Sequence, residues 1–200
     1  MNEDKDYYRG IYINWKPSCQ SEYYHEGDKF VFKTKQGVPG KCLNDDKPVL
    51  WEDDGSIRFT HKERCETRSK KLLLGNYVWS ADVDIDCKTF AFYSCLYQLH
   101  WSESTVDNHV KLGVNKSGYF TINNASMKDC KFTIPCSLKI KIECRESYTN
   151  VDYFSNDQYI GSYRKLTTEL PYMKFGVYAF CTKSDITQTY DNVRVNYNKL

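Results

Sequence analysis

Short runs in which apolar and polar residues alternate recur along the whole chain, and they constrain the fold more than any other feature. Successive side chains of a β-strand point to opposite faces, so this alternation predicts strands that bury one face. No segment of helical length carries an apolar stripe at the helical period. About ten runs of strand length are present: residues 29–35, 56–61, 77–86, 89–101, 109–114, 118–123, 137–144, 158–163, 172–180 and 189–197.

Turn signals and composition specify how these strands are arranged. NDDKP (44–48), EDDG (52–55) and NKSG (115–118) separate successive runs. Aromatic residues make up 16% of the chain, and 17 of its residues are Tyr, as is typical of strands with amphipathic faces. Two packed antiparallel sheets, an all-β sandwich of the jelly-roll kind, satisfy this pattern. Because no repeat or linker interrupts the chain, we expect one domain over residues 1–200.

The overall charge argues neither for nor against a polyanionic partner. The formal net charge is +2, from 28 basic and 26 acidic residues, so any basic site must be local. No apolar run approaches the roughly 20 residues of a membrane span, and the opening MNEDKDYYRG lacks the pattern of a signal peptide. We expect a monomer with no membrane and no nucleic-acid partner.

The nine cysteines bear on whether the protein works inside or outside the cell. They form no CxxC pair and no Cys/His spacing suited to zinc, so we expect no metal. The sequence favours disulfides in a secreted protein, with at least one thiol unpaired, over reduced core cysteines. The sequons at Asn115 and Asn124 fit secretion. The cysteines are Cys19, Cys42, Cys65, Cys87, Cys95, Cys130, Cys136, Cys144 and Cys181.

Two short motifs place polar side chains on one face of a strand. In RCETR (64–68), Arg64, Glu66 and Arg68 share a face, and two guanidinium groups around one carboxylate suit a substrate carboxylate. In QLH (98–100), Gln98 and His100 project together from a strand that is otherwise apolar. Taken alone, each motif also fits an ordinary salt-bridged or hydrogen-bonded strand, and only the combination favours a site.

A third motif, YMKFGVY (172–178), belongs with these two. Tyr172, Lys174, Gly176 and Tyr178 share one face, while the residues between them face the core. Gly176 would leave room for a ligand to lie close against the sheet.

In this order and at these separations, the three motifs resemble the signature strands of polysaccharide lyase family 7, the alginate lyases: R-x-E-x-R, Q-x-H and Y-x-K-x-G-x-Y. The closing YDNVRV (190–195) is similar to the last core strand of related jelly-roll lyases. The resemblance spans about residues 28–197, and the related glucuronan lyases fit the motifs as well. It implies a concanavalin A-like jelly roll with a concave substrate groove.

The resemblance also implies a reaction and roles for four residues. Such lyases cleave a 4-linked uronic-acid polymer by β-elimination, which removes the C5 proton and leaves an unsaturated sugar. By matching position, Arg64 and Gln98 would neutralise the substrate carboxylate. His100 would assist them or act as general base, and Tyr178 would protonate the leaving oxygen.

Four further residues would bind the anionic polysaccharide. Glu66 would orient Arg64 and Arg68, while Arg68 and Lys174 would contact flanking sugar carboxylates. Tyr172 would line the same site. The resemblance implies no metal or other cofactor.

Two other functions remain open on this fold. In DVDID (82–86), Asp82, Asp84 and Asp86 share a strand face and resemble the carboxylate strand of laminarinase-like glycoside hydrolases, whose chemistry needs two carboxylates. A non-catalytic, lectin-like carbohydrate-binding module is the alternative from another class.

The remaining histidines and two of the tryptophans receive structural interpretations. We expect His25, His61 and His109 to be surface or hydrogen-bonded residues. We expect Trp79 and Trp101, which lie in strand patterns, to pack in the core.

Overall fold

The computed structural model describes residues 7–8, 11–12, 16–17, 22–34, 62–87, 93–101, 108–180 and 185–199. In these ranges the chain forms β-strands and no helix, which confirms the all-β prediction. It follows that no helix able to span a membrane occurs there.

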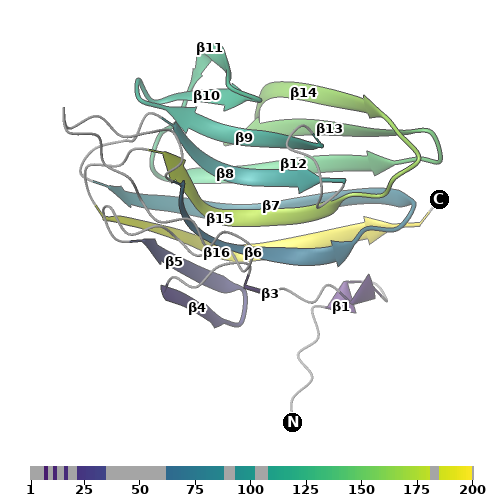
Figure 1. Ribbon diagram of the computed structural model, residues 1–200, viewed down its shortest axis with the longest axis horizontal. Helices are drawn as coiled ribbons and strands as arrows, with labels where there is room; N and C mark the ends of the chain where they lie inside the picture. Colours follow the sequence, from purple (N-terminus) through teal and green to yellow (C-terminus); the bar gives the residue numbers. More distant parts are fainter. Residues whose placement is uncertain are drawn as a thin grey trace.

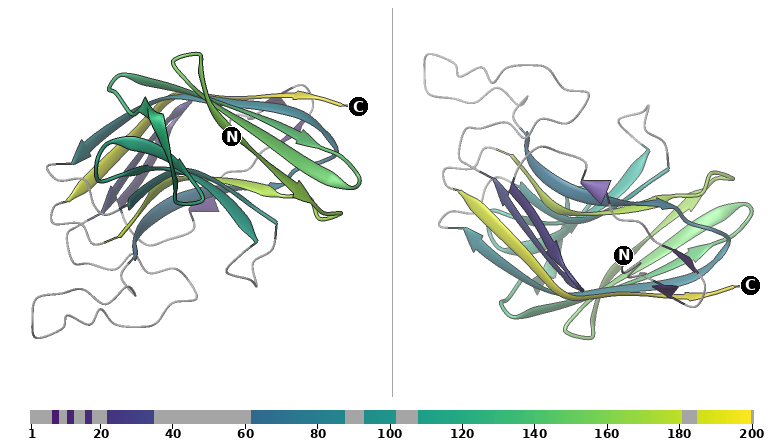
Figure 2. Two further views of the ribbon diagram at one scale, coloured as in Figure 1. Left: turned by 90° about the horizontal axis from the view of Figure 1, so that it is seen from above. Right: turned by 90° about the horizontal axis from the view of Figure 1, so that it is seen from below.

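Most of the strands form two antiparallel sheets of seven strands each, which lie face to face (Figures 1 and 2). One, called the site sheet below, has the order β11 (Ala125–Lys131), β10 (Tyr119–Ile122), β9 (His109–Asn115), β8 (Tyr93–His100), β15 (Tyr172–Phe180), β6 (Lys62–Lys71), β3 (Lys16–Pro17).

The other, called the back sheet below, has the order β14 (Gln158–Leu166), β13 (Tyr148–Ser155), β12 (Cys136–Cys144), β7 (Gly75–Cys87), β16 (Ile186–Asn198), β5 (Lys29–Thr34), β4 (Glu22–Glu26). A separate pair is formed by β1 (Tyr7–Tyr8) and β2 (Ile11–Tyr12). Strands β8 to β11 pair in chain order in the site sheet, and β12 to β14 do so in the back sheet. The chain passes between the sheets from β6 to β7, from β11 to β12 and from β14 to β15. The jelly-roll prediction is confirmed.

The core between the sheets is built from the buried faces of the alternating strands. Trp79 on β7 packs against Phe175 of the site sheet, with ring centroids 5.3 Å apart, and Phe175 in turn lies 5.0 Å from Tyr190. Trp79 and Trp101 are fully buried, as predicted. Each large apolar side chain removed from water contributes about 1.5–3 kcal/mol, so this aromatic centre holds the two layers together.

The ten predicted runs omit the short strands β1 to β3 and also β4, β11 and β13, and β6 was expected only through the RCETR motif. On β11 almost every side chain is exposed or half-exposed, so no buried face exists to give an apolar alternation. On β13 the outward positions include Asn150 and Asp152, residue types with low β-propensity. They obscure the strand pattern of the sequence, although Val151 and Tyr153 between them are buried. The predicted strand 56–61 and the start of 89–101 lie outside the described residues.

The expected disulfides do not form among the cysteines whose side chains the structure describes. None of Cys65, Cys95, Cys130, Cys136 and Cys144 is in a disulfide, and four of the five are buried. The disulfide prediction is therefore wrong for these residues. Cys65 and Cys95 lie on strands separated by β15, and Cys136 and Cys144 lie at opposite ends of β12. Cys19, Cys42, Cys181 and the side chain of Cys87 lie outside the described part.

Candidate functional site

The three motifs lie on three neighbouring strands, because β15 pairs with β8 on one side and with β6 on the other (Figure 1). Lys174 lies opposite Gln98 on β8 and opposite Arg68 on β6. Tyr178 lies opposite Arg64. The backbone thus brings together segments that are separated by more than half of the chain.

The alternation expected for QLH and for the first half of YMKFGVY is found in the structure. Tyr97, Leu99 and Trp101 belong to the core cluster, as do Met173 and Phe175, so the motif residues between them point away from the core. Tyr178 contacts Cys95 in a small cluster separate from the core. The site sheet therefore carries an apolar inner face and a polar outer face along these strands.

A buried polar network joins the three motifs. Lys174 Nζ lies 2.9 Å from Glu66 Oε2 in a salt bridge, and Gln98 Nε2 donates a hydrogen bond to Glu66 Oε1. His100 Nε2 lies 2.8 Å from Gln98 Oε1. Glu66 and Gln98 are 1% exposed and Lys174 is 2% exposed. A buried charge requires a counter-charge and hydrogen bonds, and this network supplies both.

This network differs from the role expected for one of its members, Lys174. The Glu66 carboxylate accepts from Lys174 and Gln98. Its expected role of orienting Arg64 and Arg68 stays a prediction, because the Arg64 side chain lies outside the described part. Lys174 was expected to meet a substrate carboxylate, yet its ammonium lies buried against Glu66. The register explains the difference, because it places Lys174 beside both motif strands, where the Glu66 carboxylate is within reach.

His100 is half-buried, and its ring lies between two other rings. The Tyr172 ring is stacked on it at 5.4 Å with an interplanar angle of 19°, and the His109 ring is stacked at 5.0 Å with an angle of 26°. The Arg68 guanidinium lies 5.7 Å from the centroid of Tyr172. Stacking on both sides fixes the plane of the imidazole, and His109 therefore belongs to the site rather than to an unrelated surface.

Tyr178 meets a cation that the motifs do not contain. Lys111 Nζ lies 5.1 Å from the centroid of its ring, within cation–π range. Lys111 and His109 both belong to β9, where they face Gln98 and His100 across the pairing. The only sequence signal was the polar spacing of HVK on a predicted strand, which carries no information until the strand partner is known.

For Arg64 the structure gives the backbone position opposite Tyr178, and its side chain lies outside the described part. Gly176 has a different role from the one expected. A Cβ there would lie 2.4 Å from the Cys65 carbonyl oxygen, 2.8 Å from Glu66 Cα and 3.1 Å from Phe32 Cδ1. The space beside Gly176 is thus filled by β6 and the core rather than kept for a ligand.

The carboxylates of DVDID lie in a different layer. Asp82, Asp84 and Asp86 are exposed on β7 of the back sheet, and Asp82 Oδ2 accepts a hydrogen bond of 2.8 Å from Asn192 Nδ2. They do not join the three motifs. In the described ranges no three His, Cys, Asp or Glu side chains come together in a group able to hold a metal ion.

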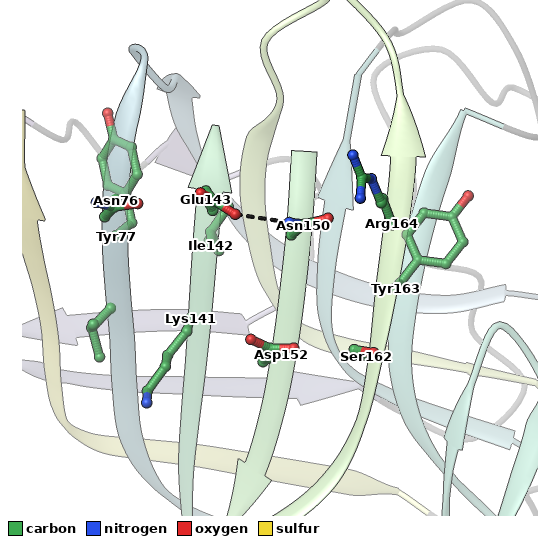
Figure 3. A pocket seen from close by; sticks show the side chains of 11 residues that line it. Asn76, Tyr77, Lys141, Ile142, Glu143, Asn150, Asp152, Ser162, Tyr163 and Arg164 are labelled. Carbon is green, nitrogen blue, oxygen red and sulfur yellow. Dashed lines mark hydrogen bonds between the residues drawn. The ribbon is translucent and has the colours of Figure 1, made fainter. Parts of the chain in front are cut away.

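A shallow hollow of about 470 Å³ lies on the outward face of the back sheet, where side chains project from β7, β12, β13 and β14 (Figure 3). Asn150 Nδ2 donates a hydrogen bond of 2.7 Å to Glu143 Oε2 within it. The hollow is lined by Asn76, Tyr77, Val78, Lys141, Ile142, Glu143, Asn150, Asp152, Ser162, Tyr163 and Arg164.

Comparison with known proteins was informative only at the level of structure. No family model matches the sequence, and no curated protein matches it. An alginate lyase from Corynebacterium sp. is 12% identical, with a TM-score of 0.54 over 86% of this chain and 78% of that one. Alginate lyase A1-II', a member of polysaccharide lyase family 7, is 13% identical, with a TM-score of 0.53 over 89% of this chain and 84% of that one.

This chain has the fold of the alginate lyases. A sialidase shares the fold too, at 9% identity and a TM-score of 0.55, over 92% of this chain and 17% of the sialidase. The chain therefore spans about a sixth of the length of that protein. The likeness in each case is one of fold, so an argument about activity must come from the site residues.

Proposed function

We propose that this protein is a polysaccharide lyase that cleaves a 4-linked uronic-acid polymer, alginate or glucuronan, by β-elimination. The observation that carries the proposal is that Gln98 and His100 on β8 share the outer face of the site sheet with Tyr178 on the neighbouring β15. Lys111, which pairs with Gln98, lies over the Tyr178 ring. We treat residues 1–200 as one unit that acts as a monomer outside the cell.

The difficult step of such a reaction is removal of a proton next to a carboxylate, because negative charge builds up on a group that is already anionic. Arg64 and Gln98 would neutralise that carboxylate. Gln98 donates one amide N–H to Glu66 and would turn its second N–H to the substrate carboxylate. His100 would assist or take the C5 proton, and Tyr178 would protonate the departing O4.

The remaining motif residues would act around this centre. Arg68 and Tyr172, which lie against each other beside His100, would contact the neighbouring sugar. Glu66 and Lys174 neutralise each other's charge, so they would act by holding Gln98 in place rather than by binding the polymer. Lys111 would add positive charge near Tyr178.

The test is a cleavage assay with polymannuronate, polyguluronate and glucuronan, each followed by the ultraviolet absorbance of the unsaturated product. We expect a rise with at least one polymer. The Tyr178→Phe variant should be about 10²–10⁴-fold slower, because it lacks the acid proton. Tyr159→Phe is the matched control, since Tyr159 is exposed on the back sheet, and it should keep the wild-type rate. A flat trace with folded protein on all three polymers would refute the lyase proposal.

A second candidate function, binding of a sugar chain without cleavage, is favoured by the hollow on the back sheet. Its amide, carboxylate and hydroxyl groups suit sugar hydroxyls, and Asp152 lies in its middle (Figure 3). Affinity electrophoresis with the same polymers separates the two functions. Retardation without turnover, lost in Asp152→Ala but kept in Tyr178→Phe, would support binding alone.

A further inference from the structure

We infer that Glu66 is a positioning residue which, acting through Gln98, fixes His100 as the tautomer that carries its proton on Nε2. Glu66 does not contact the imidazole; its carboxylate sets the orientation of the amide that does. The substrate-related part of this inference rests on the proposed function, whereas the tautomer itself does not.

The polarity of the network follows from the chemistry of its groups. A carboxylate is only an acceptor and an ammonium is only a donor, so Lys174 donates to Glu66. Gln98 can approach the other carboxylate oxygen only with its NH₂ group. Its carbonyl oxygen must then face His100, as observed. A carbonyl oxygen is only an acceptor, so His100 Nε2 must carry the hydrogen.

This assignment has a consequence for the proposed reaction. A neutral imidazole carries one proton, so with Nε2 protonated the lone pair belongs to Nδ1. Nδ1 is then the atom that could take the C5 proton. The His100 ring is stacked between Tyr172 and His109, which holds its plane. Because the ring cannot turn freely, the tautomer decides which of its nitrogens can accept a proton.

The substitution Glu66→Gln should reverse the tautomer of His100, and it therefore tests the inference directly. Lys174, a donor only, would take the carbonyl oxygen of the new amide and leave its NH₂ group facing Gln98. Gln98 would then turn its own carbonyl oxygen toward position 66 and its NH₂ group toward His100. His100 Nε2 would become an acceptor, so the proton would move to Nδ1. A buried carboxylate replaced by its amide would thus invert the tautomer of a histidine that it does not touch.

The test is NMR of the full chain labelled with ¹⁵N in its histidines. The chemical shifts of both ring nitrogens are measured through their long-range couplings to the ring protons. A pH series identifies the range in which the His100 ring is neutral, and the shifts are compared there. His100→Asn assigns the signals among the four histidines. In the wild type we expect Nε2 to show the shift of a protonated nitrogen and Nδ1 that of a nitrogen with a lone pair. In Glu66→Gln we expect the two shifts to exchange.

Glu143→Gln is the matched control, because it makes the same change at a carboxylate that accepts from an amide, Asn150, on the other sheet. It should leave the His100 shifts unchanged. A wild-type His100 with its lone pair on Nε2 would overturn the inference, as would a folded Glu66→Gln variant with the wild-type pattern. If Glu66→Gln does not fold, the wild-type shifts alone decide. The result does not depend on cleavage, so an inactive protein would leave it standing.

Discussion

Lys174 and Glu66 form an ion pair between β15 and β6 with an Nζ to Oε2 distance of 2.9 Å, and neither side chain has appreciable contact with solvent. The pair lies beside Gln98, which is proposed to meet the substrate. Its two charges neutralise each other, and the carboxylate also receives the amide of Gln98. This pair makes the polar face of the site sheet a fixed structure rather than a row of mobile charges.

Replacing Lys174 with Met should strongly destabilise the protein. The change leaves the Glu66 charge buried without a partner, and loss of one member of a buried pair costs about 3–5 kcal/mol. Urea unfolding followed by circular dichroism measures the free energy of unfolding.

Lys139→Met is the control for that prediction. Lys139 pairs with Asp157 at the surface, where the two side chains are 41% and 84% exposed. Exposed pairs contribute about 0–1 kcal/mol, so this variant should unfold close to the wild type. Equal losses in the two variants would contradict a special role for the buried pair.

Gly176→Ala should destabilise the protein by about 3 kcal/mol or more, because strain and overpacking add. The new Cβ would lie 2.4 Å from the Cys65 carbonyl oxygen, and φ is +130°. Gly118→Ala separates the two effects, since Gly118 has φ +79° and no atom within 4 Å of the new Cβ. There we expect only the conformational loss of about 1–2 kcal/mol. Thermal unfolding of both variants checks the ranking, and a milder effect at Gly176 would contradict it.

The protein should lose stability in alkali. Burial raises the pKa of Tyr77, Tyr97, Tyr153 and Tyr190 above the ordinary value of 10.0. The folded state thus favours the neutral phenols, so their contribution to stability is complete below pH 10 and falls as the pH rises toward the raised values. Tyrosinate absorbance should therefore increase for these residues in step with the loss of the circular dichroism signal. Ionisation of these phenols in a chain that stays folded would contradict the prediction.

The buried thiols should resist alkylation in the folded protein. Burial raises the pKa of Cys144 to about 12 and also raises that of Cys136, so little of the nucleophilic thiolate is present at neutral pH. Half-exposed Cys130 should react first. Iodoacetamide labelling with peptide mass spectrometry, before and after unfolding, checks this order. A cross-linked peptide that contains Cys136 or Cys144 would contradict the free-thiol assignment.

The sequence was sufficient to assign the residues of QLH to a face, because the alternation of strand side chains is local. Gln98 and Tyr97 therefore fell on the correct sides of β8. It was not sufficient to identify the partners. The pairing of Glu66 with Lys174, 108 positions apart, and the stacking of His109 on His100 depend on which strands lie side by side.

The sequence by itself determined the all-β class and the inner and outer face of the motif strands, since both follow from a period of two residues along the chain. It also determined that polar groups of the three motifs would need partners, because an apolar strand face cannot bury them alone. Only the tertiary structure decided which partners these are. Strand order and register place Glu66, Gln98 and Lys174 within hydrogen-bond reach. Because these side chains are buried away from water, Lys174 and Gln98 donate to the Glu66 carboxylate instead of to solvent.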